Sequence, residues 1–251
     1  MASVTKRIKE ISQPRGGYLP PKLFEVIDLN DSITLHPNEN IHASLVGLAV
    51  DYLSRASVCG SALEDAFGIS LKGAALVGQL KQAEKLLKKI KKFDFTAIEA
   101  ACQLAGYDVC FRAGPEFFNG IDHIKPDQDT LENIDAMVHR SEIFFERFGP
   151  IIWDGFTFEG GYTDTVNAGD GDFLTLDTLW DYKVSAKAPT NQHTLQLLMY
   201  YIMGMHSEHD CFKKIKYIGI FNPRLNKAYR FELAKLDPAI IEAIEKDVIC
   251  Y

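Results

Sequence analysis

The hydrophobic period of this chain changes near Thr157, and this change constrains the fold more than any other feature. Before it, apolar residues recur every three or four positions, as on the inward face of a helix. After it, short segments alternate apolar and polar residues, as strands do when one face is buried. The sequence therefore predicts the α/β class in its α+β form, with a large helical N-terminal part followed by a part that contains both strands and helices.

The expected elements follow from these periods and from the glycines and prolines between them. Residues 1–38 are expected to form an irregular arm with a short strand at Leu23–Leu29. Helices are predicted over Glu39–Ala56, from Ser61 onward, and over Lys72–Lys92, Phe95–Ala105, Asp127–Arg147, Asn191–Met205 and Pro238–Ile249. Strands are predicted over Phe158–Val166, Gly171–Leu176, Leu179–Ser185, Ile215–Phe221 and Tyr229–Leu233. No repeat or low-complexity linker interrupts the chain, so we expect one domain over residues 1–251, with a helical part at 39–150 and a sheet core at 151–251.

The cysteines and the apolar segments indicate the compartment. Five cysteines are scattered with no CxxC pair, which favours reduced thiols and argues against a zinc or iron–sulfur site. No apolar run approaches membrane-spanning length, and the basic N-terminus lacks the apolar stretch of a secretory signal. We therefore expect a cytoplasmic protein. The cysteines are Cys59, Cys102, Cys110, Cys211 and Cys250.

The net charge of −7 hides an uneven distribution. Residues 81–92 contain six lysines against one acid, Glu84, and residues 213–230 contain six basic residues and no acid. Residues 151–182 show the reverse, with seven acids and no lysine or arginine. An acidic centre with basic tracts elsewhere suits a metal-dependent enzyme that acts on a polyanion, although a lysine run by itself is usually a solvated helix face.

Two short segments in the acidic region bring charged groups together. Alternation along the strand at Leu179–Ser185 places Asp181 and Lys183 on one face. Gly169 and Gly171 allow a tight turn before Asp172, and a turn at 177–178 would fold that residue's strand against the strand of Asp181. Two carboxylates from neighbouring strands form a hard oxygen site suited to Mg²⁺ or Mn²⁺. The simpler interpretation of the Asp-Lys pair is a cross-strand ion pair of about 1 kcal/mol or less.

The helix that follows offers a polar stripe. His193, Gln196, Tyr200 and Met203 recur at spacings of three and four and therefore share one face. A glutamine and a tyrosine on that stripe could hydrogen-bond a phosphate or a metal-bound water. Taken alone, the segment would be interpreted as an ordinary polar helix edge.

Together, the Gly171-Asp172-Phe173, Asp181-Tyr182-Lys183 and Gln196-x-x-x-Tyr200 segments resemble the PD-(D/E)XK nuclease superfamily, in particular its RecB-type branch. The resemblance covers roughly residues 157–205. It implies a restriction-endonuclease-like core, with a central mixed β-sheet flanked by helices, and two-metal cleavage of DNA. It also implies that Asp172 and Asp181 bind the metal, that the Tyr182 carbonyl adds a ligand, that Lys183 is the catalytic lysine, and that Gln196 and Tyr200 support them.

That branch also takes a histidine or an acid from an early helix. His42 is the first candidate for this upstream metal ligand, and the remaining candidates are Asp51, Glu64, Glu142 and Glu146. A histidine at a helix N-terminus with only a local hydrogen bond is an equally good interpretation of His42. The iron–sulfur cysteines of some relatives have no counterpart here, and the chain contains no GxxxxGK[ST] motif.

The sequence thus predicts a Mg²⁺-dependent (or Mn²⁺-dependent) DNA nuclease, an exonuclease or end-processing enzyme of the kind used in DNA repair and recombination. No separate recognition domain is evident, which favours non-specific contact with phosphates. RNA stays open as a substrate, and so does a homo-oligomer. The alternative hypothesis is a non-catalytic DNA-binding or protein-interaction module that retains the nuclease fold.

Overall fold

The computed structural model describes residues 2–58, 62–90 and 93–251, and it divides the chain into two compact units. The sheet unit comprises Met1–Leu29 and Arg147–Tyr251, and the helical unit comprises Asn30–Glu146. The expectation of one domain over the whole chain stays a prediction. Of the residues singled out above, Cys59, Ser61, Lys91 and Lys92 lie outside the described residues.

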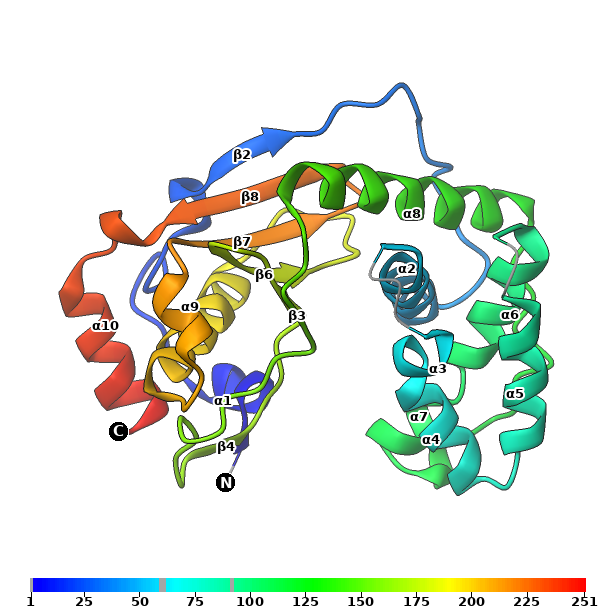
Figure 1. The fold of residues 1–251 in the computed structure, drawn as a ribbon, viewed down its shortest axis with the longest axis horizontal. Coiled ribbons are helices and arrows are strands. Elements are labelled where there is room, and N and C mark those ends of the chain that lie inside the picture. The colour runs from blue at the N-terminus through cyan, green and yellow to red at the C-terminus, as the bar shows by residue number, and fades with distance from the viewer. Residues whose placement is uncertain (1, 59–61, 91–92) are drawn as a thin grey trace. The chain divides into compact units, whose positions relative to one another are not determined.

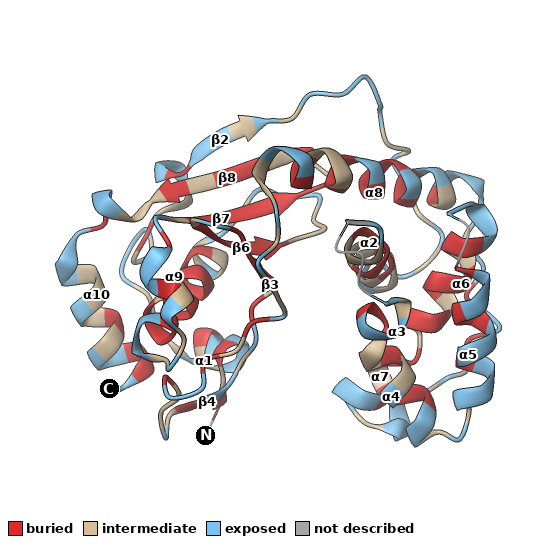
Figure 2. Cartoon of the chain, in the orientation of Figure 1, coloured by how far each residue is buried: buried red, intermediate tan, exposed pale blue. Residues whose placement is uncertain are grey.

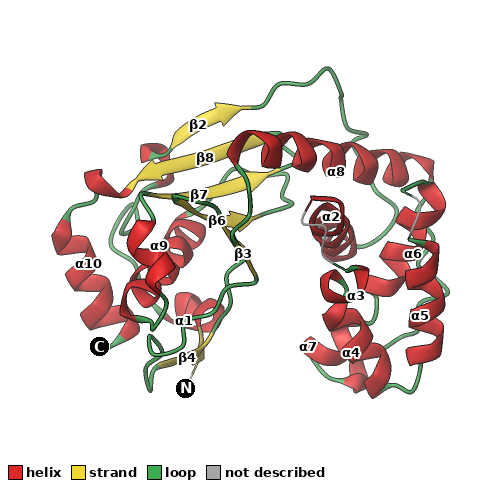
Figure 3. Cartoon of the chain, viewed as in Figure 1, coloured by secondary structure: helices red, strands yellow, loops and turns green. Residues whose placement is uncertain are grey.

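The helical unit consists of helices and connecting turns, as the period of its apolar residues predicts (Figures 1 and 3). Its elements are α2 (Ala43–Val58), α3 (Leu63–Ala66), α4 (Gly68–Leu76), α5 (Leu80–Lys89), α6 (Phe95–Ala105), α7 (Asp108–Arg112), the 3₁₀ turn η2 (Pro115–Phe117) and α8 (Gln128–Phe148), whose last two residues belong to the sheet unit. The range Phe95–Ala105 is confirmed, and Asp94 caps that helix by accepting a hydrogen bond from the Ala97 N–H at 2.9 Å.

Two helix predictions in this unit are corrected. The helix expected over residues 72–92 is broken, because Gly78 adopts a φ of +70° between α4 and α5 and such a conformation ends an α-helix. The helix expected from Glu39 begins at Ala43, which leaves His42 just outside it. At both positions the apolar residues keep their helical spacing, although the backbone there is not helical.

The sheet unit contains a mixed six-stranded sheet, which confirms the predicted fold class at that level. The strand order is β2-β8-β7-β6-β5-β3, with β6 and β7 parallel and the other neighbours antiparallel. The strands are β2 (Glu25–Asp28), β3 (Trp153–Asp154), β5 (Phe173–Leu174), β6 (Thr178–Tyr182), β7 (Tyr217–Asn222) and β8 (Lys227–Glu232); β1 (Ala2–Ser3) pairs separately with β4 (Val166–Ala168). The helical elements are α1 (Val4–Glu10), η1 (Pro21–Leu23), α9 (Asn191–His206), η3 (Asp210–Lys214), η4 (Leu233–Lys235), α10 (Pro238–Ile244) and the π-helical turn η5 (Glu245–Ile249).

Two predictions fail in the sheet unit. The arm predicted to be irregular contains α1, which Ser3 caps by accepting a hydrogen bond from the Lys6 N–H at 3.3 Å. The strand predicted over residues 158–166 is absent, and that segment forms loops and turns up to β4. Its alternating aromatics are buried for another reason, since Phe158 stacks on the Tyr200 ring at 5.4 Å rather than lying in a sheet.

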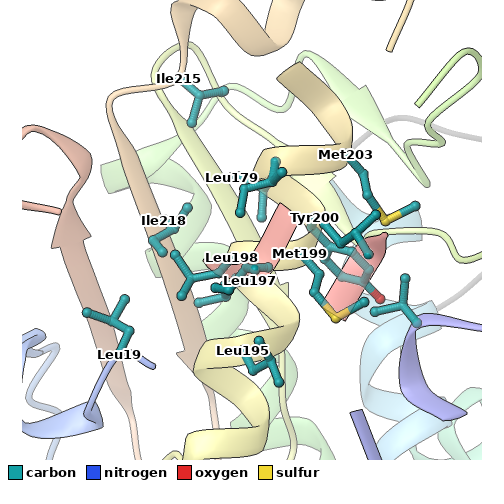
Figure 4. Close-up of a cluster of buried hydrophobic side chains, with 14 of the residues drawn as sticks. Leu19, Leu179, Leu195, Leu197, Leu198, Met199, Tyr200, Met203, Ile215 and Ile218 are labelled. Atoms are coloured by element: carbon teal, nitrogen blue, oxygen red, sulfur yellow. The ribbon is translucent and has the colours of Figure 1, made fainter. Parts of the chain in front are cut away.

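One hydrophobic core lies between the sheet and α9, the helix that follows β6. Its members include Leu174, Leu179 and Ile218 from the strands and most of the apolar residues of α9. Figure 4 shows Leu198 and Met199 of α9 gathered with Leu179 and Ile218, and Figure 2 shows α9 and the central strands largely buried. This packing fixes α9 over the strand that carries Asp181.

The other face of β6 is also buried, and this makes β6 a fully enclosed strand. Trp180 packs edge-on against Phe148 at 5.3 Å, and its indole N–H donates to the Thr175 hydroxyl at 3.2 Å. Gly219 on β7 is required beside it, because a Cβ there would lie 2.4 Å from the Trp180 ring. Among the described residues, no helix is both long and apolar enough to cross a membrane.

Candidate active site

The β5–β6 hairpin sets the two aspartates opposite one another. Phe173 pairs with Trp180 and Leu174 with Leu179, and the Thr175 N–H donates to the Thr178 carbonyl at 2.9 Å. The two-residue loop is therefore 176–177, one residue earlier than the sequence predicts. Continuing the register by one pair toward the open end places Asp172 opposite Asp181.

Directly opposed residues of an antiparallel pair point to the same side of the sheet. Asp172 and Asp181 therefore share the face of Leu174 and Leu179, which belong to the core beneath α9. The prediction that a hairpin brings the two carboxylates together agrees with this register.

Asp172 is held by the backbone of the strand opposite. Its Oδ2 accepts a hydrogen bond from the Tyr182 N–H at 2.5 Å, and its carbonyl accepts one from the Gly155 N–H at 2.7 Å. Gly171 precedes it because a Cβ at that position would overlap the Phe156 ring at 1.9 Å. This glycine thus admits an aromatic ring, whereas the sequence argument assigned it to a turn.

Asp181 is almost completely enclosed, with 1 % of its surface exposed. Its Oδ1 accepts a hydrogen bond from Lys183 Nζ at 2.9 Å, which confirms that these two side chains share a face. Among the described residues no hydrogen-bond partner reaches its other oxygen, Oδ2, which is also buried. Burial raises the pKa of Asp181, and the charge of Lys183 opposes that rise without cancelling it.

Lys183 reaches this carboxylate from the solvent side, since 29 % of its side chain is exposed. The Lys183 N–H donates to the Phe221 carbonyl at 2.9 Å, which continues the pairing of β6 with β7. The backbone is therefore fixed while the ammonium group can contact both Asp181 and a molecule arriving from solvent.

Gln196 and Tyr200 lie on one face of α9, as the helical spacing predicts. Gln196 Nε2 donates a hydrogen bond to Tyr200 Oη at 2.7 Å, and both side chains are buried. The pKa of Tyr200 is well above its ordinary value, first because of burial and then because of the negative charges of Asp181 and Asp172. The phenol therefore lies in the field of the acid pair and stays protonated.

His193 lies at the start of the same stripe. The Thr190 N–H donates to its Nδ1 at 3.2 Å, so the neutral ring carries its proton on Nε2. Burial and the nearby charge of Lys183 both lower the pKa of His193. The sequence placed this histidine on the stripe but gave it no role.

Asp170 is a second residue for which the sequence argument found no role. It is exposed, and its charge adds to those that raise the pKa of Tyr200. Its position two residues before Asp172 in a glycine-rich segment was the available signal.

The upstream candidates all lie in the helical unit, and their role as metal ligands stays a prediction. His42 precedes α2, and its Nδ1 accepts a hydrogen bond from the Ser44 N–H at 3.2 Å, the local bond of the simpler interpretation. Asp51 pairs with Arg55 at 3.1 Å. The others are Glu142, which accepts a hydrogen bond from the Ser57 hydroxyl, and the exposed Glu64 and Glu146.

Within the described residues, no three or more His, Cys, Asp or Glu side chains are grouped to hold a metal ion. The donors that the hairpin offers are the carboxylates of Asp172 and Asp181 and the backbone oxygens around them. The buried, unpartnered Oδ2 of Asp181 fits a cation, because a charged oxygen without a partner is costly to bury.

No protein-family model matches this chain, and neither a curated protein nor a solved structure matches it. The interpretation of the site therefore depends on its own chemistry.

Proposed function

We propose that this protein is a Mg²⁺- or Mn²⁺-dependent nuclease that hydrolyses phosphodiester bonds of DNA, acting as an exonuclease or end-processing enzyme. The observation that carries the proposal is the buried Asp181, whose Oδ1 contacts Lys183 and whose Oδ2 has no partner among the described residues. A carboxylate in that state is suited to bind a cation. The Asp…Asp-x-Lys…Gln-x-x-x-Tyr resemblance supports the same assignment.

Asp172 and Asp181 would hold the metal, with the Tyr182 carbonyl as a further oxygen. Carboxylate and carbonyl oxygens are the ligands that Mg²⁺ prefers, and both carboxylates point to the same face of the sheet. When bound, such an ion polarises a phosphoryl oxygen and lowers the pKa of a coordinated water. Asp172 can contribute while keeping its bond from the Tyr182 N–H, because a carboxylate has several lone pairs.

Lys183 is the residue that meets the substrate. Its side chain is partly exposed and its ammonium group lies 2.9 Å from Asp181 Oδ1, so it can orient an attacking water or stabilise negative charge on the phosphorus centre. Tyr200 accepts a hydrogen bond from Gln196, which leaves the phenolic proton available to the acid pair. Its raised pKa keeps that proton in place over the whole physiological range.

Contact with DNA requires positive charge outside this acidic centre. The described lysines of α5, namely Lys81, Lys85, Lys88 and Lys89, are all exposed, whereas Ala83, Leu86 and Leu87 of the same helix are buried. A face of this kind suits salt-dependent, sequence-independent contact with phosphates. It favours a nuclease without sequence preference.

The test is hydrolysis of end-labelled linear double-stranded DNA, single-stranded DNA and RNA, with and without Mg²⁺ or Mn²⁺. The wild type should release products only when metal is present. Lys183→Ala and Asp172→Asn should release no products with or without metal. Lys187→Ala is the matched control, because Lys187 is an exposed lysine four residues along the chain. If wild type and Lys183→Ala are equally inactive on both DNAs and on RNA, the nuclease proposal fails and the non-catalytic alternative replaces it.

A further inference from the structure

The helical unit contains a pocket of about 610 Å³ that lies apart from the acid pair in sequence and belongs to a different unit. Its wall is built from the residues that start α2, the end of α6, α7 and the segment at 113–124. Pockets that bind small molecules are usually a few hundred to about a thousand Å³ and combine an apolar wall with a few polar groups. The chemistry of this wall narrows the class of ligand.

The carboxylate in the wall already has hydrogen-bond partners within the protein. Asp108 is the one acidic residue among the described residues that line the pocket, and it is buried. Its Oδ1 accepts from the Ser70 hydroxyl at 2.5 Å. Its Oδ2 accepts from the Tyr52 hydroxyl at 2.5 Å and from Arg112 Nε at 3.3 Å. Both of its oxygens are therefore occupied by donors of the protein, and Arg112 offsets part of its charge.

Three of the remaining polar residues, Arg112, His42 and His123, offer hydrogen-bond donors, and Ser44 and Asn119 also line the pocket. Arg112 has 56 % of its side chain exposed; Asp108 and Tyr52 engage its Nε and one terminal nitrogen, and the described residues leave Nη1 without a partner. His42 accepts the Ser44 N–H at Nδ1, so its neutral ring presents an N–H at Nε2. His123 is exposed at the rim. A wall of this kind is complementary to an anion such as a phosphate.

The rest of the wall is apolar and includes a flat ring. Leu48, Val109 and Ile124 line the pocket, and Phe117 stands beside them with 56 % of its surface exposed. The next residue, Phe118, stacks on Tyr107 at 5.3 Å, which anchors the backbone that presents Phe117. An exposed phenyl ring on an anchored segment can stack on a planar aromatic ligand.

We propose that this pocket binds a nucleoside monophosphate group, with the phosphate at Arg112, His42 and His123 and the base against Phe117. The same chemistry is offered by a free nucleotide and by the 5′-phosphorylated end of a DNA strand. The proposal goes beyond the nuclease function and does not depend on it, because it requires neither metal nor hydrolysis.

The test is a calorimetric titration of the full-length protein in EDTA, which keeps divalent cations from the acid pair. The probes are deoxyadenosine monophosphate, deoxyadenosine, inorganic phosphate and a short 5′-phosphorylated oligodeoxynucleotide. The monophosphate should bind at least about ten times more tightly than either deoxyadenosine or phosphate. Preference for the oligonucleotide over the monophosphate would identify a strand end as the ligand, and equal affinity would identify the free nucleotide.

Variants at exposed positions avoid disturbing the fold. Phe117→Ala and His123→Ala should each weaken the monophosphate by about fivefold or more, since stacking and a phosphate contact are worth that much. Lys125→Ala, an exposed change close in sequence, and Lys187→Ala, an exposed change in the sheet unit, should leave binding unchanged. The proposal is overturned if the monophosphate binds no better than its two parts, or if both pocket variants bind like wild type. Either result would leave the nuclease assay unaffected, so the two proposals fail separately.

Discussion

Replacing Asp181 by asparagine should stabilise the protein without metal and remove its stabilisation by metal. In the wild type, a carboxylate oxygen is buried with no partner among the described residues, and Asp172 lies opposite on the same face. An unsatisfied buried charged oxygen costs about 1–3 kcal/mol, and like charges directly opposite on a sheet add to that cost. The asparagine amide is neutral, and the Asp172 carboxylate can accept a hydrogen bond from its N–H groups.

The same substitution loses an ion pair, and this sets the size of the net effect. The Lys183 side chain is 29 % exposed, so solvent screens its attraction to Asp181 and the pair is worth about 1 kcal/mol or less. The net gain of Asp181→Asn in EDTA is therefore about 1 kcal/mol in the free energy of unfolding. For a chain of this size that corresponds to about 2–4 °C in the unfolding midpoint.

Mg²⁺ should reverse the order of the two proteins. A ligand that binds only the folded state stabilises it by about 2.7 kcal/mol at a hundred times its Kd. The wild type should gain that increment as Mg²⁺ is raised, and Asp181→Asn should gain little of it. The more stable protein in EDTA should thus become the less stable one in saturating Mg²⁺.

The dependence on pH has a definite sign. Burial raises the pKa of Asp181 in the folded state. Between its unfolded and its folded pKa, the folded protein therefore binds more protons than the unfolded chain. This contribution to stability is present below the unfolded pKa of 3.8 and is lost as the pH rises through the folded pKa. Without metal, the fall should be shallower in Asp181→Asn.

The assay is urea unfolding followed by tryptophan fluorescence. The chain has two tryptophans, Trp153 and Trp180, and both lie in the sheet unit, so the signal reports on the unit that holds the acid pair. Asp164→Asn, a change at an exposed aspartate, is the control and should match wild type in both buffers. A loss of more than about 1 kcal/mol for Asp181→Asn in EDTA would refute the argument from the unpartnered oxygen. Equal responses of the two proteins to Mg²⁺ would refute the metal site.

Three further results are expected. Lys183→Met should lower the rate of DNA hydrolysis by about 10²–10⁴-fold while binding of labelled DNA in Ca²⁺ is retained; unchanged single-turnover rates would contradict its catalytic role. Tyr200→Phe should keep the fold but lower the hydrolysis rate by about tenfold and the unfolding free energy by about 1 kcal/mol, because Gln196 loses its acceptor; a rate equal to wild type would exclude the phenol from the site. Gly219→Ala should cost about 1–3 kcal/mol in urea unfolding, because its Cβ would lie 2.4 Å from the Trp180 ring; a stability equal to wild type would show that the two strands accommodate it freely.

The local sequence pattern was sufficient to predict the structure of several parts of this protein. Helical spacing predicted the helix at 95–105 to the residue and the helix from Asn191 to within one residue of its end. Alternation along β6 predicted that Asp181 and Lys183 share a face, and their 2.9 Å contact agrees. These features depend on neighbours two to four residues apart, which the sequence displays directly.

Alternation also misled where two different kinds of packing give the same pattern. The aromatics around Phe158 alternate like a strand, but they are buried against Tyr200 and Phe212 in a loop. The sequence cannot separate these cases, because both bury every second side chain. Which one occurs is decided by α9, whose residues lie dozens of positions away.

The state of Asp181 is decided only by the tertiary structure. The sequence by itself determined that an aspartate and a lysine lie side by side on a strand, and such a pair on a surface would contribute little. Burial on both faces of β6, by α9 on one side and by Phe148 on the other, removes water from that strand. One carboxylate oxygen is thereby left without water and without a donor among the described residues, and burial raises the pKa of Asp181. Desolvation is a property of everything packed around a group, so no local pattern could have shown it.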